Sequence, residues 1–218
     1  MSKLITISSF SDLLDAFDMH PATVYRGVSC YNCHKLIPSI GRNDEFTYDK
    51  HIEAHMFRLF KEKSIPFLSN TSRDDWEFLA LAQHYKLPTR LLDWTWNPFV
   101  AVYFSVKDCE KEDGAVYTLY AAIVPSHKPC SDPLETSGYC IYNPPHFDNR
   151  IVAQSGLFTC QEKPDQEFPT EDCDIIIIPK GLKKDIRHKL RILNIHTATL
   201  FPSLEGVAYS IREDPTYN

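Results

Sequence analysis

Glycine is scarce in this sequence, with 7 residues among 218, whereas proline occurs 15 times. No segment is of low complexity and no stretch is repeated, so we expect an ordered chain apart from its ends. No run of 18 apolar residues occurs, and the first residues, MSKLITISSF, lack the features of a secretory signal. We therefore expect a cytoplasmic protein that makes no membrane contact. The net charge of −6 argues against general coating of nucleic acid, although it is compatible with a local basic patch.

Several familiar catalytic motifs are also missing. The sequence contains no GxGxxG, Walker loop, HExxH or GxSxG pattern. No carboxylate cluster suited to metal ions is evident, which disfavours a nuclease. The seven cysteines are odd in number and scattered, which favours reduced thiols. Cys30 and Cys33 have CxxC spacing, but no second CxxC or paired histidine motif completes a zinc site, so two loop cysteines are favoured and no metal is expected.

Hydrophobic residues at 43% and aromatic residues at 12% are sufficient for one sizeable core. We predict helices over 9–18, 49–63, 72–88, 98–104 and 181–194, and strands over 23–28, 114–124, 150–159, 174–179 and 207–211. These elements do not alternate regularly as βαβ units. The predicted class is α+β, a single domain over 1–218 with a mixed or antiparallel sheet and flanking helices.

The stretch from Trp76 to Phe104 contains all three tryptophans. We predict a buried helix capped by Thr71 or Ser72 and ended by Pro88. An irregular polar segment, residues 89–95, follows. A second buried helix then begins with Asn97 as its cap and Pro98 at its first position.

Charged residues within this stretch are costly to bury unless they are paired. Arg90 and Asp93 lie three residues apart, and either form a structural pair or line a pocket together with Gln83 and His84. Glu53, on the preceding helix, is either a solvated carboxylate or the internal partner of Arg26 or Arg90.

The strand TVYRGV places Arg26 between apolar residues. Its partner is either an internal carboxylate or an anionic ligand such as the diphosphate of a dinucleotide. Gly27 allows another backbone or a ligand to come close.

Two blocks in the sequence resemble a known family. They are Tyr25-Arg26-Gly27 and the run QHYKLPTRLLDWT over 83–95, followed by Asn97-Pro98. Together they resemble the FRG domain, which is named for its aromatic-Arg-Gly triplet. Segments 150–159 and Phe201-Pro202 also fit, so the resemblance extends over a core of about residues 20–212.

A second resemblance is to the ADP-ribosyltransferase superfamily. It implies an ADP-ribosyltransferase-like fold and NAD as the substrate. Combined with the pocket suggested above, it leads us to expect NAD contacts for Tyr25, Arg26, Gly27, Gln83, His84, Thr89, Arg90, Trp94 and Thr95, and catalytic roles for Gln154, Asp93 and Arg26. Gln154 stands where the superfamily has a glutamate, and an amide cannot act as a base. Asp93 or Glu53 is then the candidate carboxylate for stabilising an oxocarbenium-like state.

The resemblances together predict an NAD-dependent toxin or antiphage effector that modifies a nucleic acid or a protein. An antitoxin or another defence-system protein is the expected partner. The alternative is a non-catalytic nucleotide-binding or protein-interaction module. The predicted helix at 181–194 has a basic side, which is either a solvated face or a surface that steers a nucleic acid or an acidic partner. This side comprises Lys183, Lys184, Arg187, Lys189 and Arg191.

Overall fold

The computed structural model describes residues 3–18, 23–42, 47–68, 73–120 and 130–212. The strands are β1 (Leu4–Thr6), β2 (Thr23–Val28), β3 (Leu91–Thr95), β4 (Gly114–Tyr120), β5 (Tyr139–Tyr142), β6 (Gly156–Gln161) and β7 (Cys173–Ile178). The α-helices are α1 (Phe10–Asp18), α2 (Lys50–Ser64), α3 (Asp75–His84), α4 (Pro98–Val106), α5 (Asn149–Ala153), α6 (Lys183–Ile192), α7 (Thr197–Leu200) and α8 (Leu204–Arg212). Within the described residues, no helix is long and apolar enough to cross a membrane.

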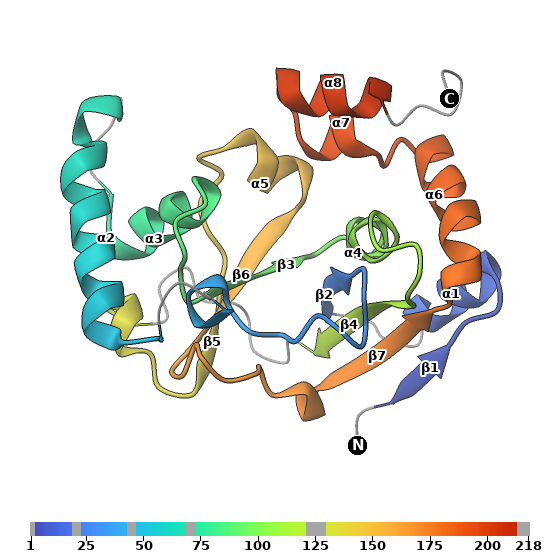
Figure 1. The fold of residues 1–218 in the computed structure, drawn as a ribbon, viewed down its shortest axis with the longest axis horizontal. Coiled ribbons are helices and arrows are strands. Elements are labelled where there is room, and N and C mark those ends of the chain that lie inside the picture. The colour runs from blue at the N-terminus through green and yellow to red at the C-terminus, as the bar shows by residue number, and fades with distance from the viewer. Residues whose placement is uncertain (1–2, 19–22, 43–46, 69–72, 121–129, 213–218) are drawn as a thin grey trace.

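The strands form one seven-stranded sheet in the order β1-β7-β4-β2-β3-β6-β5. β1 and β7 run parallel, and the other neighbouring strands run antiparallel. The sheet crosses the middle of the molecule, with α2 and α3 towards one end and α1 and α6 towards the other (Figure 1). The α+β class with a mixed sheet and flanking helices is confirmed.

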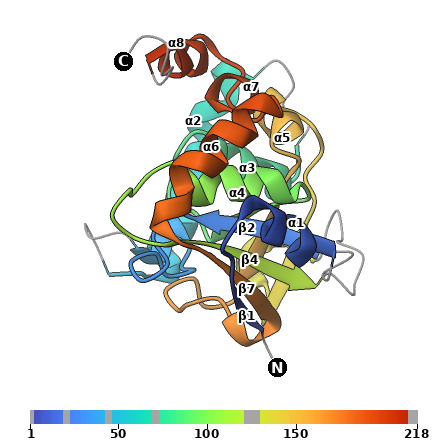
Figure 2. The same cartoon turned by 90° about the vertical axis from the view of Figure 1, so that its right-hand side faces the viewer.

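Both faces of the sheet are covered. Helices α4 and α6 lie on the same side of the sheet, as the rotated view shows (Figure 2), and α4 packs on β2 and α6. Tyr25, on β2, belongs to this core, whereas Val24 and Val28 belong to the core on the opposite face. This alternation follows from the period of two in a strand. A third cluster joins α2 and α3 to β3, β5 and β6.

Helix α4 approaches β2 closely because Gly27 has no side chain. A Cβ atom at this position would lie 1.8 Å from the carbonyl oxygen of Ala101 in α4. Of the two alternatives for Gly27, close approach of another backbone or of a ligand, the structure supports the first. Asn97 caps α4 by accepting a hydrogen bond from the Phe99 amide at 3.0 Å, with Pro98 at the first position as predicted.

Three predicted elements are wrong. The segment 89–95 contains strand β3, because it pairs along its length with β6. The predicted strand 150–159 is divided into helix α5 and strand β6. The predicted strand 207–211 lies within helix α8. Thr71 and Ser72 lie outside the described residues, and Asp74 caps α3 by accepting from the Glu77 amide at 2.9 Å.

Candidate functional site

A cavity of about 170 Å³ lies between α3, β3, α5 and the start of β6. It brings together five of the predicted site residues, Gln83, His84, Asp93, Trp94 and Gln154. The other lining residues are Ala80, Arg150, Ile151, Gly156, Leu157, Phe158 and Phe201. We call this cavity the Asp93 pocket.

Asp93 is the only acidic residue among the described residues that line the pocket. Its side chain is 61% exposed. The Gln83 amide nitrogen Nε2 lies 3.2 Å and 3.3 Å from the two Asp93 carboxylate oxygens. The Gln83 oxygen Oε1 accepts a hydrogen bond from the Thr89 hydroxyl at 2.7 Å. This bond fixes the amide so that its donor group faces Asp93. The carboxylate is therefore oriented yet open to solvent.

Arg26, on β2, contacts Asp93 on the neighbouring strand β3. β2 and β3 are paired only at Tyr25 and Thr95, whereas β2 pairs with β4 over six residues. The Arg26 guanidinium bridges the diverging strands, with Nη1 donating to the Asp93 carbonyl oxygen at 2.5 Å. The same nitrogen lies 3.8 Å from the Asp93 carboxylate. The internal carboxylate considered for Arg26 is thus Asp93.

The Arg26 side chain is only 16% exposed and is not among the pocket-lining residues. Burial lowers the pKa of Arg26, and the Asp93 charge opposes this shift. Within the described residues, the buried Arg26 Nε has no hydrogen-bond partner. Arg26 therefore sets the position of Asp93, and its predicted contact with an anionic ligand remains a prediction.

His84 lies on another side of the pocket. Its Nε2 is 3.4 Å from the Asp148 carboxylate. Burial lowers the pKa of His84, and the nearby Arg150 charge lowers it further, although Asp148 acts in the opposite direction. The neutral imidazole is therefore favoured at neutral pH, and in this form it can accept a proton.

The lowered pKa of His84 predicts a pH dependence of stability. Between its lowered pKa and the ordinary value of 6.5, the unfolded chain binds more protons than the folded one. Stability from this group is therefore complete above 6.5 and is lost as the pH falls below it. We expect the melting temperature to fall between about pH 7.5 and 5.5. Burial lowers the pKa of His34 and His196 in the same direction.

Melting curves of two variants isolate the contribution of His84. His84→Gln should show a weaker pH dependence than the wild type. His51→Gln, which changes an exposed histidine on α2, should retain the wild-type dependence. A melting temperature that is flat across this range in the wild type would contradict the assignment.

Arg150 and Phe201 complete the wall of the pocket. The Arg150 guanidinium lies 5.7 Å from the centre of the Phe201 ring, within the range of a cation–π interaction. In the sequence, both residues stand out only as parts of the FRG resemblance. Their pairing arises from the approach of α5 to α7, which no local pattern indicates.

Gln154 follows α5 and lies outside β6, so its predicted place in a strand is wrong. Its side-chain Nε2 donates to the backbone carbonyl oxygen of Leu200 at 3.0 Å. The backbone carbonyl oxygen of Gln154 accepts a hydrogen bond from the Thr95 hydroxyl at 2.6 Å. The amide thereby connects the end of α5 to α7. Gln154 still lines the pocket, and its catalytic role remains a prediction.

The predicted Arg90–Asp93 pair does not form. Arg90 is 1% exposed, and its Nε and Nη2 donate to the two Glu53 carboxylate oxygens at 2.9 Å and 2.6 Å. Tyr48 donates its hydroxyl to Glu53 at 2.9 Å. Burial opposes the charge on Arg90, but the hydrogen bonds and charge of Glu53 raise its pKa overall. Glu53 is 2% exposed, so the alternative that Glu53 is a solvated carboxylate is wrong.

The remaining predicted contact residues have internal partners. Trp94 is 3% exposed, and its Nε1 donates to the Thr159 hydroxyl at 2.9 Å. The Thr95 hydroxyl accepts from the Asn97 amide at 3.0 Å. Tyr25 packs edge-on against Phe17, with ring centres 5.4 Å apart. These side chains hold the strands and α4 around the pocket.

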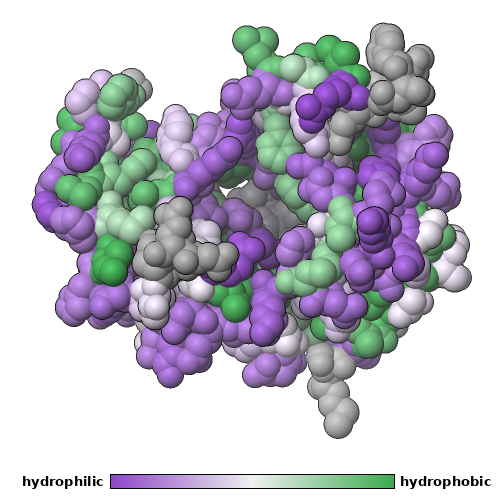
Figure 3. All heavy atoms as spheres, viewed as in Figure 1, coloured by the Kyte–Doolittle hydropathy of each residue, from purple (hydrophilic) through white to green (hydrophobic). Residues whose placement is uncertain are grey.

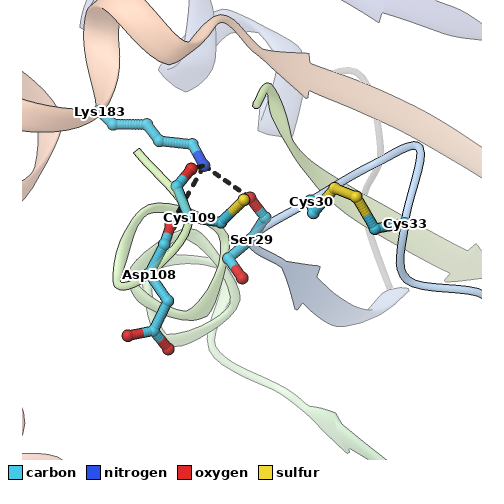
Figure 4. Close-up of a disulfide and its surroundings, with 6 residues drawn as sticks. All are labelled: Ser29, Cys30, Cys33, Asp108, Cys109 and Lys183. Atoms are coloured by element: carbon cyan, nitrogen blue, oxygen red, sulfur yellow. Dashed lines mark hydrogen bonds between the residues drawn. A yellow bond between two sulfur atoms is a disulfide. The ribbon is translucent and has the colours of Figure 1, made fainter. Parts of the chain in front are cut away.

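Cys30 and Cys33 form a disulfide with an S–S distance of 2.06 Å, so the expectation of reduced loop cysteines is wrong for this pair. Lys183 lies nearby, fully buried, with its Nζ donating to the carbonyl oxygens of Ser29, Asp108 and Cys109 at 2.6–3.3 Å (Figure 4). Burial lowers the pKa of Lys183. Lys183 therefore joins α6 to the ends of β2 and α4 and does not belong to the exposed basic face.

The fold and site define an α+β protein whose mixed sheet carries a small pocket with an oriented carboxylate in its wall. Residues 21–114 match the family model of the FRG domain. This match supports the FRG resemblance and spans both the Tyr25-Arg26-Gly27 triplet and the 83–95 block. Comparisons with curated proteins and with solved structures found no match.

Proposed function

We propose that the Asp93 pocket binds the nicotinamide end of NAD and that the protein is an ADP-ribosyltransferase-like enzyme. The observation that carries this proposal is the Asp93 carboxylate, which Gln83 orients and which remains open to solvent. A fixed carboxylate beside a ribose stabilises the positive charge that develops when the nicotinamide–ribose bond breaks.

The composition of the pocket suits a ligand with separated charges. Phe158, Phe201 and Ile151 offer apolar surface for a planar ring, and Asp93 suits its positive charge. Arg150 suits an anionic group such as a diphosphate. The cavity of about 170 Å³ is smaller than the roughly 300–1,000 Å³ of sites that enclose whole drug-sized ligands. It therefore takes one end of a dinucleotide, and the rest lies outside it.

In the proposed transfer of ADP-ribose, Asp93 and His84 have separate roles. The bond between the ribose C1′ and the nicotinamide nitrogen breaks, and its electron pair leaves with nicotinamide. An oxygen or nitrogen of the acceptor forms the new bond to C1′ and loses a proton. Asp93 stabilises the positively charged ribose, and neutral His84 accepts the proton. With the family resemblance, these roles favour a toxin or antiphage effector with a defence-system partner.

A second candidate is a nucleotide-binding module without turnover. It is favoured by the hydrogen bond between Gln154 and Leu200, which gives this amide a structural role. It is also favoured by the single carboxylate among the described residues that line the pocket. NAD binding is common to both candidates, and release of nicotinamide distinguishes them.

Narrowing the pocket tests the location of the site. A Cβ atom at Gly156 would meet only Ile151 atoms at 3.7–3.8 Å, which is ordinary contact, so Gly156→Ala should fold normally. Because Gly156 lines the pocket, we expect its affinity for NAD, measured by titration calorimetry, to fall by about tenfold, equal to about 1.4 kcal/mol. Ser11→Thr, which adds one carbon atom at an exposed position on α1, is the control and should bind NAD like the wild type. Equal NAD affinity in Gly156→Ala and the wild type would place the ligand elsewhere.

A further inference from the structure

A second and larger cavity, of about 860 Å³, lies between the end of α4, helix α6 and the segments α7 and α8. Its lining residues are Tyr103, Lys107, Glu110, Gly181, Lys184, Asp185, Arg187, His188, Arg191, Ile195, His196, Thr197 and Ser210. We call it the α6 groove. Hydrophilic side chains gather over α6 on the right of the molecule in Figure 3.

The charges of the groove are opposite in sign to that of the whole chain. Four lining residues are lysine or arginine and two are acidic. Arg187 binds the Glu110 carboxylate, and Lys189, outside the groove, binds Asp185 at 2.7 Å. Both acidic groups are therefore neutralised by cations. A net positive groove on a chain of charge −6 favours an anionic ligand at this site.

Aromatic rings accompany these cations. The Lys107 ammonium lies 5.4 Å from the centre of the Phe201 ring and 5.7 Å from that of Tyr209. Neither ring is among the residues that line the groove, and both lie next to it at Lys107. Cations next to aromatic rings favour single-stranded nucleic acid, because phosphates contact the cations and bases stack on such rings.

The α6 groove adjoins the Asp93 pocket through Phe201. Phe201 lines the Asp93 pocket, where Arg150 lies against its ring. Lys107, which lines the α6 groove, lies against the same ring. A strand in the groove that passes Phe201 would reach the entrance of the pocket, where an acceptor atom is needed.

We propose that the α6 groove binds single-stranded nucleic acid and that this strand is the acceptor of ADP-ribose. The acceptor role rests on the proposed function of the Asp93 pocket, whereas strand binding does not. The transferred group bonds to an oxygen or nitrogen of the nucleotide. Nicotinamide leaves, and the acceptor proton passes to His84.

Fluorescence anisotropy without NAD tests the binding step. Labelled single-stranded DNA and RNA 12-mers are titrated with the wild type and with the double variant Lys107→Glu/Lys184→Glu. We expect the variant to bind at least tenfold more weakly. Loss of two phosphate contacts should also reduce the slope of log K against log salt by about 1.4. The control is Lys3→Glu/Lys63→Glu, which makes the same change in net charge at two exposed positions, one just before β1 and one on α2. It should bind the strand like the wild type.

Competition defines the class of ligand. We expect duplex DNA and poly-glutamate to displace the single strand only weakly. Displacement by poly-glutamate at lower concentration than by unlabelled strand would indicate an acidic protein partner and overturn the proposal. Equal binding by the groove variant and the wild type would also overturn it. Strand binding without NAD cleavage would leave the groove assignment intact and contradict only the proposed enzyme function.

Discussion

Arg90→Ala is expected to lower the free energy of unfolding by about 3–5 kcal/mol, because it leaves the buried Glu53 carboxylate without its partner. Arg90 and Glu53 are 1% and 2% exposed, so the pair is shielded from solvent in the folded protein. Urea denaturation of Arg90→Ala, Glu53→Ala and the double variant gives the coupling between the two residues. The double variant should be much more stable than the sum of the single effects predicts.

Helix α2 also provides the matched control for this pair. Arg58 and Glu62 form an ion pair at 2.7 Å, but both side chains are more than half exposed. Arg58→Ala should therefore cost less than about 0.5 kcal/mol. Additive effects of Arg90→Ala and Glu53→Ala, or losses no larger than that of Arg58→Ala, would contradict a role for the buried pair in joining α2 to β3.

Asp93→Asn is expected to reduce the rate of nicotinamide release by about a hundredfold or more. The substitution removes the charge and keeps the shape of the side chain. In the proposed reaction the carboxylate interacts most strongly with the charge that develops on the ribose, so the loss should appear in kcat rather than in the affinity for NAD. Single-turnover assays at saturating NAD, combined with calorimetric titration, separate these two quantities.

Asp15→Asn makes the same chemical change at an exposed position on α1, and should leave both quantities unchanged. Unchanged nicotinamide release in Asp93→Asn would remove this residue from the chemistry. A loss of rate matched by an equal loss of NAD affinity would assign Asp93 to binding alone.

The sequence predicted the elements that have strong local signals. The strand over 23–28 and the Asn97-Pro98 start of α4 were correct, because alternation and capping residues are local properties. Gln83, His84 and Asp93 line one cavity as predicted, but Arg90, which the prediction placed with them, is not among the lining residues. The prediction for the first three residues succeeded because they lie within the short 83–95 block, so they are close in the chain.

The predicted pair between Arg90 and Asp93 was wrong for a geometric reason. A spacing of three residues brings two side chains together on a helix, but in extended backbone it sends them to opposite faces. Because β3 runs from Leu91 to Thr95, Asp93 turns away from Arg90 and towards Gln83. The partner is Glu53, 37 residues away in the chain. A pair with Arg90 was one of the alternatives considered for Glu53, and a single sequence could not decide among them.

The segment 207–211 was mistaken for a strand because its apolar residues also fit a period of two. In the structure, Leu204, Val207 and Ile211 follow helical spacing and are all exposed. Gly206 sets the position of α8, since a Cβ there would lie 1.9 Å from the Phe201 carbonyl oxygen. That contact depends on the tertiary packing of α7 against α8.

Nicotinamide release from labelled NAD tests the central claim most directly. The wild-type protein is incubated with NAD and with separate pools of protein, RNA and DNA, and both free nicotinamide and acceptor-bound label are measured. We predict nicotinamide release with label transferred to single-stranded nucleic acid. Binding of NAD with no release of nicotinamide in any pool would contradict the proposed enzyme activity. It would support the alternative of a nucleotide-binding module.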